Sequence, residues 1–283
     1  MDYNRLYMGE VSIAIKIIKF IIIFLMVVIF LYPFILTVTV SFKTKDEVWS
    51  NFFGLPSKLN LNNYKEAWVR GNIGRSLINS FYIAIVSTFI QILLSSMVAY
   101  LIVRVKIPLK SFLFVFFSIG MMIPLHAIVL PIVKRAAHFG LYNSHIYLIL
   151  VYSAGGMPWF VFLISAYMKS IPPSLEEAAL IDGAGLIKIF FRIILPLSKP
   201  VLMTCSILAF LGGYNELLLA MALLRTREKL TIPVALSAFT GMHQVNFPEL
   251  TAAVTISIIP TVIIYLIFQE KVEKGLAAGA VKG

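Results

Sequence analysis

The sequence predicts an all-α, polytopic integral membrane protein with six transmembrane helices. Hydrophobic residues make up 60% of its 283 residues, whereas soluble domains contain roughly 45–50% apolar residues. The chain carries six apolar segments that approach or exceed the roughly 20 residues needed to cross a bilayer core. Charged residues are concentrated between these segments. No internal repeat is evident, so residues 1–283 are expected to form a single transmembrane domain.

Each expected span is an apolar run bounded by polar residues. The six spans are residues 17–40, 76–102, 111–133, 145–168, 197–223 and 250–269. The first run is longer than the roughly 7–15 residues of a signal-peptide core, and no Ala-x-Ala cleavage site follows it. We therefore interpret it as an uncleaved span.

Prolines and glycines predict irregularities in two of the spans. Pro124 and Pro131 lie inside the third span or at its end. Such prolines are tolerated where neighbouring helices or polar groups satisfy the freed carbonyls. Gly155, Gly156 and Pro158 lie near the middle of the fourth span and predict a kink there.

The charged residues and the single cysteine exclude several functions. The net charge is +11, which on a membrane protein indicates basic loops at lipid headgroups rather than nucleic-acid binding. Cys205 is the only cysteine, so no intrachain disulfide is possible. No phosphate-binding Gly-x-x-x-x-Gly-Lys-Ser/Thr loop occurs, so any ATP must bind another chain. The histidines lack metal-ligand spacing and no nucleophile–base arrangement is evident, so we expect no metal site, no catalytic residues and no enzyme activity.

The topology follows from an even number of spans, which puts both termini on one side. Lys and Arg are divided almost evenly between the two sides, so the positive-inside rule gives only a weak bias. The short basic turn 104–110 favours a cytoplasmic position for its own side, because short loops count most.

Residues 171–196 form a polar island between two apolar runs. The prolines at 172–173 end the preceding helix. Ser174 stands where an N-cap is expected, with Glu177 three residues later, which is typical of a capping box. Gly183 can end the short helix in the left-handed conformation. On these residues alone, the segment could be no more than a solvated loop with a capped helix.

Within this segment, one spacing of residues resembles a known family. The pattern comprises Glu177, Ala178, Ala179, Gly183, Ile193, Leu195 and Pro196. It resembles the EAA loop of bacterial ABC importer permeases. The longer run Glu-Ala-Ala-Leu-Ile-Asp-Gly-Ala resembles the carbohydrate-importer, MalG-like branch. The resemblance covers roughly residues 70–283, and it implies the type I ABC importer permease fold.

The resemblance also implies a set of partners. A second homologous permease would complete the pore, two ATPase subunits would carry the ATP and Mg, and an extracytoplasmic sugar-binding protein would deliver the cargo; this chain itself would hold no cofactor. It implies a multi-pass protein of the bacterial inner membrane with both termini cytoplasmic. The loop 171–196 would dock on the ATPase, and so would the cytoplasmic tail 270–283. The three glycines in residues 275–283 favour extended or irregular backbone there. The expected coupling residues are Glu177, Ala178, Ala179, Asp182 and Gly183.

Four consecutive residues in the fifth span are the candidate residues of the substrate pathway. They are Gly213, Tyr214, Asn215 and Glu216. An ionisable residue inside a span usually faces a cavity or a partner, and amide and carboxylate groups can bond sugar hydroxyls. Adjacent helical residues point about 100° apart, so we favour Asn215 and Glu216 over Tyr214 and expect both to face one space. The alternative is a structural pair that fixes helix packing.

Two other classes of function are weighed against an importer permease. An ion-coupled secondary transporter or channel needs titratable residues in its spans, and only Glu216 clearly qualifies. An integral membrane enzyme would need a catalytic constellation. Within the importer class, the sequence leaves open a mono-, di- or oligosaccharide, a polyol or glycerol phosphate.

Overall fold

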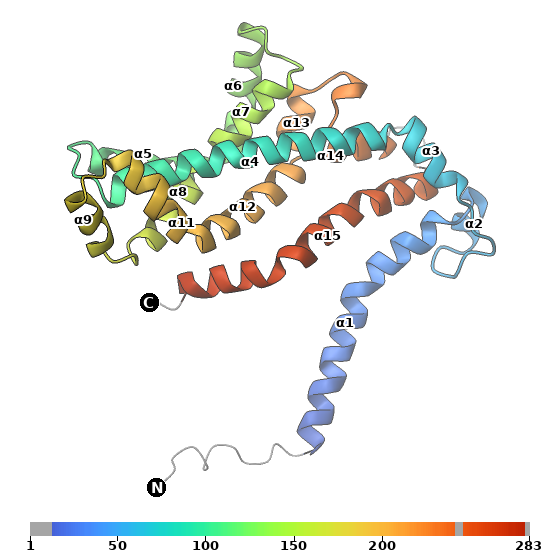
Figure 1. The fold of residues 1–283 in the computed structure, drawn as a ribbon. Coiled ribbons are helices and arrows are strands. Elements are labelled where there is room, and N and C mark those ends of the chain that lie inside the picture. The colour runs from blue at the N-terminus through green and yellow to red at the C-terminus, as the bar shows by residue number, and fades with distance from the viewer. Residues whose placement is uncertain (1–12, 241–245, 281–283) are drawn as a thin grey trace.

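The computed structural model describes residues 13–240 and 246–280, and within these ranges the chain contains helices and no strand. The α-helices, in chain order, are α1 (Ile13–Ser41), α2 (Lys45–Ser50), α3 (Asn62–Arg70), α4 (Ile73–Val103), α5 (Lys110–Met122), α6 (Leu125–His138), α7 (His145–Gly155), α8 (Met157–Met168), α9 (Ser174–Ile181), α10 (Leu186–Ile189), α11 (Leu195–Leu197), α12 (Lys199–Tyr214), α13 (Leu218–Leu223), α14 (Ile232–Ser237) and α15 (Phe247–Ala280). A π-helical turn, η2 (Phe190–Ile194), joins α10 to α11, and the 3-10 turns η3 (Arg227–Lys229) and η4 (Ala238–Thr240) flank α14. Figure 1 shows α4 running along the bundle, with α9 at one end and α2 and α3 at the other.

The described helices can cross a membrane up to six times. α1, α4 and α15 are long and apolar enough to span individually. Three further spans are bent pairs: α5 with α6, α7 with α8, and the segment from α10 to α11 with α12. The six-span prediction therefore fits the structure, with half of the spans broken.

The third span differs from the expected continuous helix 111–133. α5 and α6 meet at an angle of 100°. Ile123 has extended backbone angles of −79° and 115°, and Pro124 follows it. The proline ring disfavours helical geometry in the residue before it, so the helix ends there. Pro131, by contrast, lies inside α6.

The kink predicted in the fourth span is confirmed. α7 and α8 are bent by 44° at Gly156. Gln91 of α4 lies at this bend, and its side-chain amide donates a hydrogen bond to the Tyr152 carbonyl at 3.0 Å. A Cβ at position 156 would overlap the Gln91 amide. Gly156 therefore allows α4 to approach the kink closely.

The fifth span is also broken, where a continuous helix 197–223 was expected. α12 ends at Tyr214, and α13 begins at Leu218. At its other end, α12 is bent by 77° from the segment that precedes it. The predicted pathway residues Asn215 and Glu216 therefore lie in a break between helices and not inside a helix.

The last span extends well beyond the expected 250–269. α15 continues to Ala280, so the prediction of an extended or irregular tail is wrong for residues 275–280. Extending an existing helix needs no new nucleus, and the alanines of the tail have the highest helix propensity. Residues 281–283 of the predicted tail lie outside the described residues.

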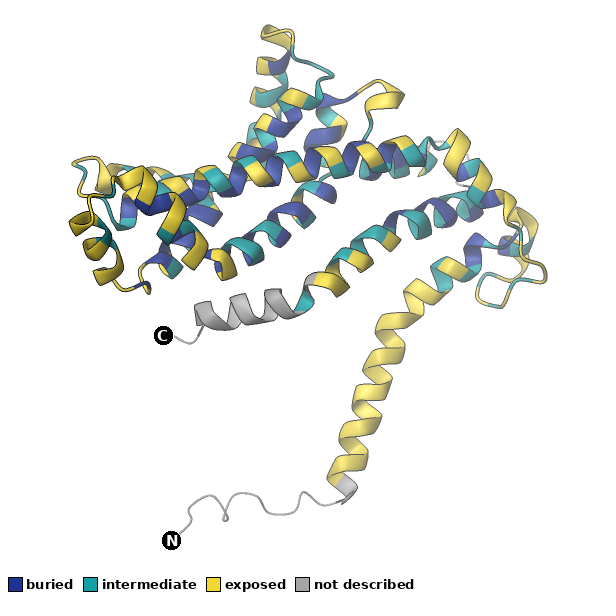
Figure 2. Cartoon of the chain, viewed as in Figure 1, coloured by how far each residue is buried: buried dark blue, intermediate teal, exposed yellow. Residues whose placement is uncertain are grey.

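α4 is the central helix of the bundle. It packs against α12, α8, α7 and α5. The buried polar residues on α4 are mainly small or uncharged: Ser76, Asn79, Ser80, Ser87, Thr88, Gln91, Ser95 and Ser96. Small residues let neighbouring helices approach closely within a membrane. Figure 2 shows the contrast with α1, which is exposed along most of its length and meets α15.

The connection between α1 and α4 is held by a fully buried lysine. The Lys43 ammonium donates to the carbonyls of Asn51 and Phe52 at 2.6 and 3.0 Å. Asn63 donates its side-chain amide to the carbonyls of Ser41 and Lys43. These bonds satisfy backbone groups that would otherwise be orphaned.

The same connection carries a stabilised carboxylate in α2. The Ser57 N–H and hydroxyl both donate to Glu47, and these hydrogen bonds lower the pKa of Glu47. Hydrogen bonds to the charged form favour ionisation.

Candidate functional site

The coupling segment, residues 171–196, leaves the bundle after α8 and returns to it at α12. It contains α9, α10, η2 and the first two residues of α11. Gly183 has a φ of +76°, which confirms the predicted left-handed turn after α9. The Gly183 and Ala184 N–H groups donate to the carbonyls of Leu180 and Ala179 at 3.0 and 2.9 Å. The turn thus satisfies the end of α9, as glycine C-terminal motifs do.

The predicted capping box at the start of α9 is wrong. Ser174 is the first residue inside α9, and the cap position belongs to Pro173, which makes no side-chain hydrogen bond there. Pro173 already has helical angles of −61° and −26°, because its ring fixes φ near the helical value. α9 therefore begins at Ser174 itself. If Ser174 were the N-cap, the helix would begin one residue later.

The predicted coupling residues lie on the outside of the chain. Glu177, Ala178, Asp182 and Gly183 are exposed, while Ala179 is half-buried and packs against the core cluster beneath. Large apolar side chains join them at the surface: Ile181 is 87% exposed and Ile187 is 77% exposed. The coupling segment therefore presents a mixed acidic and apolar surface that this chain does not cover.

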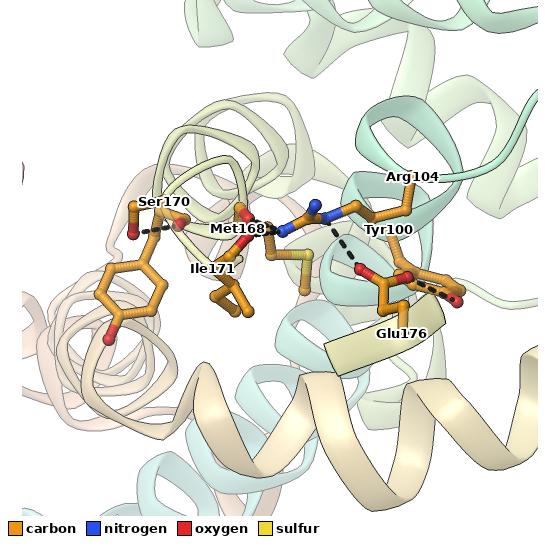
Figure 3. A network of polar contacts seen from close by, with 7 residues as sticks. Tyr100, Arg104, Met168, Ser170, Ile171 and Glu176 are labelled. Atoms are coloured by element: carbon orange, nitrogen blue, oxygen red, sulfur yellow. Dashed lines mark hydrogen bonds and ion pairs between the residues drawn. The ribbon is translucent and has the colours of Figure 1, made fainter. Parts of the chain in front are cut away.

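The neighbouring acid, Glu176, was not singled out from the sequence, and it points inward. Its Oε1 lies 3.1 Å from Nε of Arg104, the residue that follows α4. Its Oε2 accepts a hydrogen bond from the Tyr100 hydroxyl at 3.4 Å. The Arg104 guanidinium also donates to the carbonyls of Met168 and Ile171. Figure 3 shows these groups converging between the end of α4 and the start of the coupling segment.

A signal for this ion pair exists in the sequence, but it is weak. The turn 104–110 reads as a lipid-facing basic loop, and the segment offers two adjacent acids, Glu176 and Glu177. Whether Glu176 or Glu177 faces the bundle depends on the residue at which α9 begins, and Pro173 sets that residue.

A cavity of about 720 Å³ lies deeper in the bundle. Gln91 and Ser87 of α4, Trp159 of α8, and Gly213 and Glu216 contribute to its wall. The cavity is bordered by the breaks at Ile123, Gly156 and Glu216. Trp159 is 51% exposed, so it can offer an aromatic face to a molecule in this space.

Glu216 combines a cavity position with three structural hydrogen bonds. Its carboxylate accepts the Leu219 and Ala220 N–H groups at 2.7 and 3.0 Å, at the start of α13. It also accepts the Tyr152 hydroxyl at 2.6 Å. A carboxylate in this position accepts hydrogen bonds from N–H groups that have no partner within the helix. The helix dipole also stabilises its negative charge. The charge within the membrane region is thus compensated by the chain itself.

The expectation that Asn215 and Glu216 face one space is wrong. Asn215 lines a separate cavity of about 530 Å³ with Phe34 and Tyr265. Tyr214 is 3% exposed, lines that second cavity and donates its hydroxyl to the Ser257 carbonyl. Only Gly213 and Glu216 of the predicted group border the larger cavity. The break after Tyr214 turns the backbone and separates the two polar side chains.

Metal-binding residues do not converge in this region. Across residues 13–240 and 246–280, no group of three or more His, Cys, Asp or Glu side chains could hold a metal ion.

Replacing Glu216 tests its structural role. Glu216→Ala removes the acceptor for two helix-start N–H groups and leaves the Tyr152 hydroxyl unpaired, a cost of about 1–3 kcal/mol. We expect the midpoint of thermal unfolding in detergent to fall by roughly 3–10 °C. Asn215→Ala, the neighbouring exposed site, is the matched control and should stay within about 0.5 kcal/mol of the parent. Equal stability of the two variants would contradict this account.

Comparison with known proteins shows which family has this architecture. Residues 91–278 match the family model described as binding-protein-dependent transport system inner membrane component. The chain is 30% identical over 254 residues to the diacetylchitobiose uptake system permease protein NgcG of Streptomyces coelicolor, covering 89% of this chain and 84% of that protein. It is 34% identical over 252 residues to the melibiose/raffinose/stachyose import permease protein MelC of Bacillus subtilis, covering 89% and 91%.

A solved structure supports the fold independently of close sequence similarity. The chain matches a subunit of a bacterial ABC transporter involved in the import of the acidic polysaccharide alginate, with a TM-score of 0.82 and 22% identity. The match covers 93% of this chain and 98% of that one. The chain therefore belongs to the family of binding-protein-dependent transport system inner membrane components and is a permease subunit of an ABC transporter.

Proposed function

We propose that this chain is a permease subunit of an ATP-driven carbohydrate importer in a bacterial inner membrane. It forms the translocation pathway together with a second, homologous permease. The observation that carries the proposal is the coupling segment, which presents exposed acidic and apolar side chains between two spans. A chain without a phosphate-binding loop needs such a docking surface for a separate ATPase subunit, whose conformational changes drive transport.

The coupling segment transmits a conformational change of the ATPase subunits to this chain. Two ATPase subunits hold ATP and Mg and contact Glu177, Ala178, Ala179, Asp182 and Gly183. Their closure displaces α9, and the spans rearrange so that the central cavity changes the side to which it opens. In such alternating access, the state that is populated depends on differential binding to the two conformations.

The orientation of the chain follows from this docking. The coupling segment must be cytoplasmic, and α2 and α3 lie at the opposite end of the bundle (Figure 1). α15 runs from that opposite end toward the end that holds α9 (Figure 1). We therefore propose that both termini are cytoplasmic and that an extracytoplasmic sugar-binding protein delivers the cargo to the opposite face.

The cavity suits an uncharged, hydroxyl-rich cargo. Trp159 supplies an aromatic face, and Gln91 and Glu216 supply polar groups at the wall. Relatives carry the names of uptake systems for diacetylchitobiose and for melibiose, raffinose and stachyose. Of the residues predicted for substrate contact, Gly213 and Glu216 remain in the proposal, whereas Asn215 and Tyr214 border the second cavity.

An ion-coupled mechanism fits these contacts less well. A coupling carboxylate must exchange its proton or cation during each cycle. Both oxygens of Glu216 already accept hydrogen bonds from the backbone or from Tyr152, so releasing the carboxylate would uncap α13.

Uptake measurements test the proposal directly. A strain lacking this chain should lose uptake of at least one radiolabelled sugar from a panel containing diacetylchitobiose, melibiose and trehalose, with glycerol phosphate included as a charged alternative. Uptake restored by the chain should stop when ATP is depleted and persist when an ionophore collapses the ion gradients. Sensitivity to the ionophore with ATP intact would instead favour the secondary transporter.

The turn at Gly183 supplies a second test. Gly183→Val forces a branched residue into the left-handed conformation, at a cost of about 1–2 kcal/mol. Membrane insertion should be retained, while sugar uptake per ATP hydrolysed falls. Gly185→Val is the matched control, because Gly185 has a φ of −74° and both positions face open space. Normal uptake by Gly183→Val would refute a role for this turn.

The C-terminal extension of α15 supplies a third test. Deleting residues 275–283 removes the end of a helix that we propose contacts the ATPase. We expect all six spans to insert and ATP hydrolysis by the complex to fall. A frayed terminus without a partner would instead leave uptake and hydrolysis unchanged.

A further inference from the structure

The ion pair between Arg104 and Glu176 differs from an ordinary surface pair. The side chains are only 9% and 13% exposed. Exposed pairs contribute little, but leaving one buried charge without its partner is strongly unfavourable. The Nε–Oε1 separation of 3.1 Å brings the charges into contact, while the guanidinium Nη2 donates to two backbone carbonyls.

Arg104 connects three parts of the chain at one point. It follows the last residue of α4, and its guanidinium donates to carbonyls at the end of α8 and at the start of the coupling segment, Met168 and Ile171. Glu176 lies in the first turn of α9. Figure 3 shows the guanidinium between these elements. The planar, forked shape of arginine allows several such bonds at once, whereas lysine offers a single ammonium.

Aromatic packing supports the same junction from the other side. Tyr100 is 5% exposed, and its ring lies 5.3 Å from that of Phe190 in η2. Its hydroxyl reaches Glu176. Both the beginning and the end of the coupling segment are therefore attached to the last turn of α4.

The other part of α4 borders the large cavity. Gln91 lies 13 positions before Arg104, which is about 20 Å along a helix. α4 has no break in this interval. A displacement of α9 at Glu176 can therefore reach the cavity wall through one continuous helix.

We propose that Arg104 and Glu176 are a positioning pair that fixes the coupling segment to α4, so that movement of α9 is delivered to the cavity wall. Neither residue lines the large cavity. The proposal deepens the proposed function and rests on it.

The experiment uses the complete complex, co-purified with its ATPase subunits and reconstituted in nanodiscs. A nitroxide at Ser174→Cys reports the mobility of α9, with the buried Cys205 replaced by Ala. Arg104→Gln and Glu176→Gln each break the pair. We expect a mobile nitroxide fraction at least three times that of the parent, and ATP hydrolysis at least five-fold slower at an unchanged content of ATPase subunit.

Conservative and double variants separate positioning from general damage. Arg104→Lys keeps the charge but loses the forked contacts with Met168 and Ile171, so the complex should hydrolyse ATP faster than with Arg104→Gln but more slowly than the parent. Arg104→Gln together with Glu176→Gln should be no worse than Arg104→Gln alone, because coupled residues are not additive. The Glu66–Arg70 pair of α3, whose side chains are 24% and 76% exposed, is the matched control, and neutralising either member should change neither measurement.

Several outcomes would overturn the proposal. It fails if the single variants assemble with parental mobility and hydrolysis, or if their effects add in the double variant. If the neutral variants do not insert, Glu176→Asp decides: it keeps the charge but shortens the side chain, and parental mobility of α9 in that variant would refute the positioning role. Absence of the ATPase from the parent complex would instead refute the proposed function itself.

Discussion

The architecture depends on satisfying the backbone groups that are freed where spans break. No water is available in a bilayer core to pair them, so the protein must supply partners. α4 and the residue that follows it provide such partners at one break and in the adjoining connections. Gln91 donates to the Tyr152 carbonyl at the kink between α7 and α8, and Asn79 donates to the carbonyls of Glu228 and Leu230. Arg104 donates to the carbonyls of Met168, at the end of α8, and of Ile171, at the start of the coupling segment. One unbroken helix thus stabilises the irregular elements around it.

Sequence reasoning was most successful where local chemistry decides the structure. The first two spans match α1 and α4 closely, because their ends are set by polar residues beside long apolar runs. The kink at Gly156 and the left-handed Gly183 follow from glycine and proline, whose backbone preferences operate in any context. The position of residues 171–196 between two spans was predicted on the same basis.

The errors arose where the structure depends on tertiary contacts or on the residue at which a helix begins. The break at Asn215 and Glu216 requires a carboxylate that caps α13 and meets Tyr152 of another span, which no pattern within the fifth span reveals. The inward direction of Glu176, as opposed to Glu177, depends on the residue at which α9 begins. The helical tail shows that an existing helix can continue through glycines that would prevent a new one from forming.

The positions of the breaks have a mechanical consequence. The breaks at Ile123, Gly156 and Glu216 border one cavity, and chain breaks are where backbone angles can change most easily. The coupling segment, in contrast, is attached to the unbroken α4. A force applied at α9 would therefore move α4 as a rigid body, while the broken spans adjust around the cavity. Both a rigid helix that transmits the movement and local hinges in the other spans are required. A cavity wall made only of straight helices could not change shape without separating the packed core.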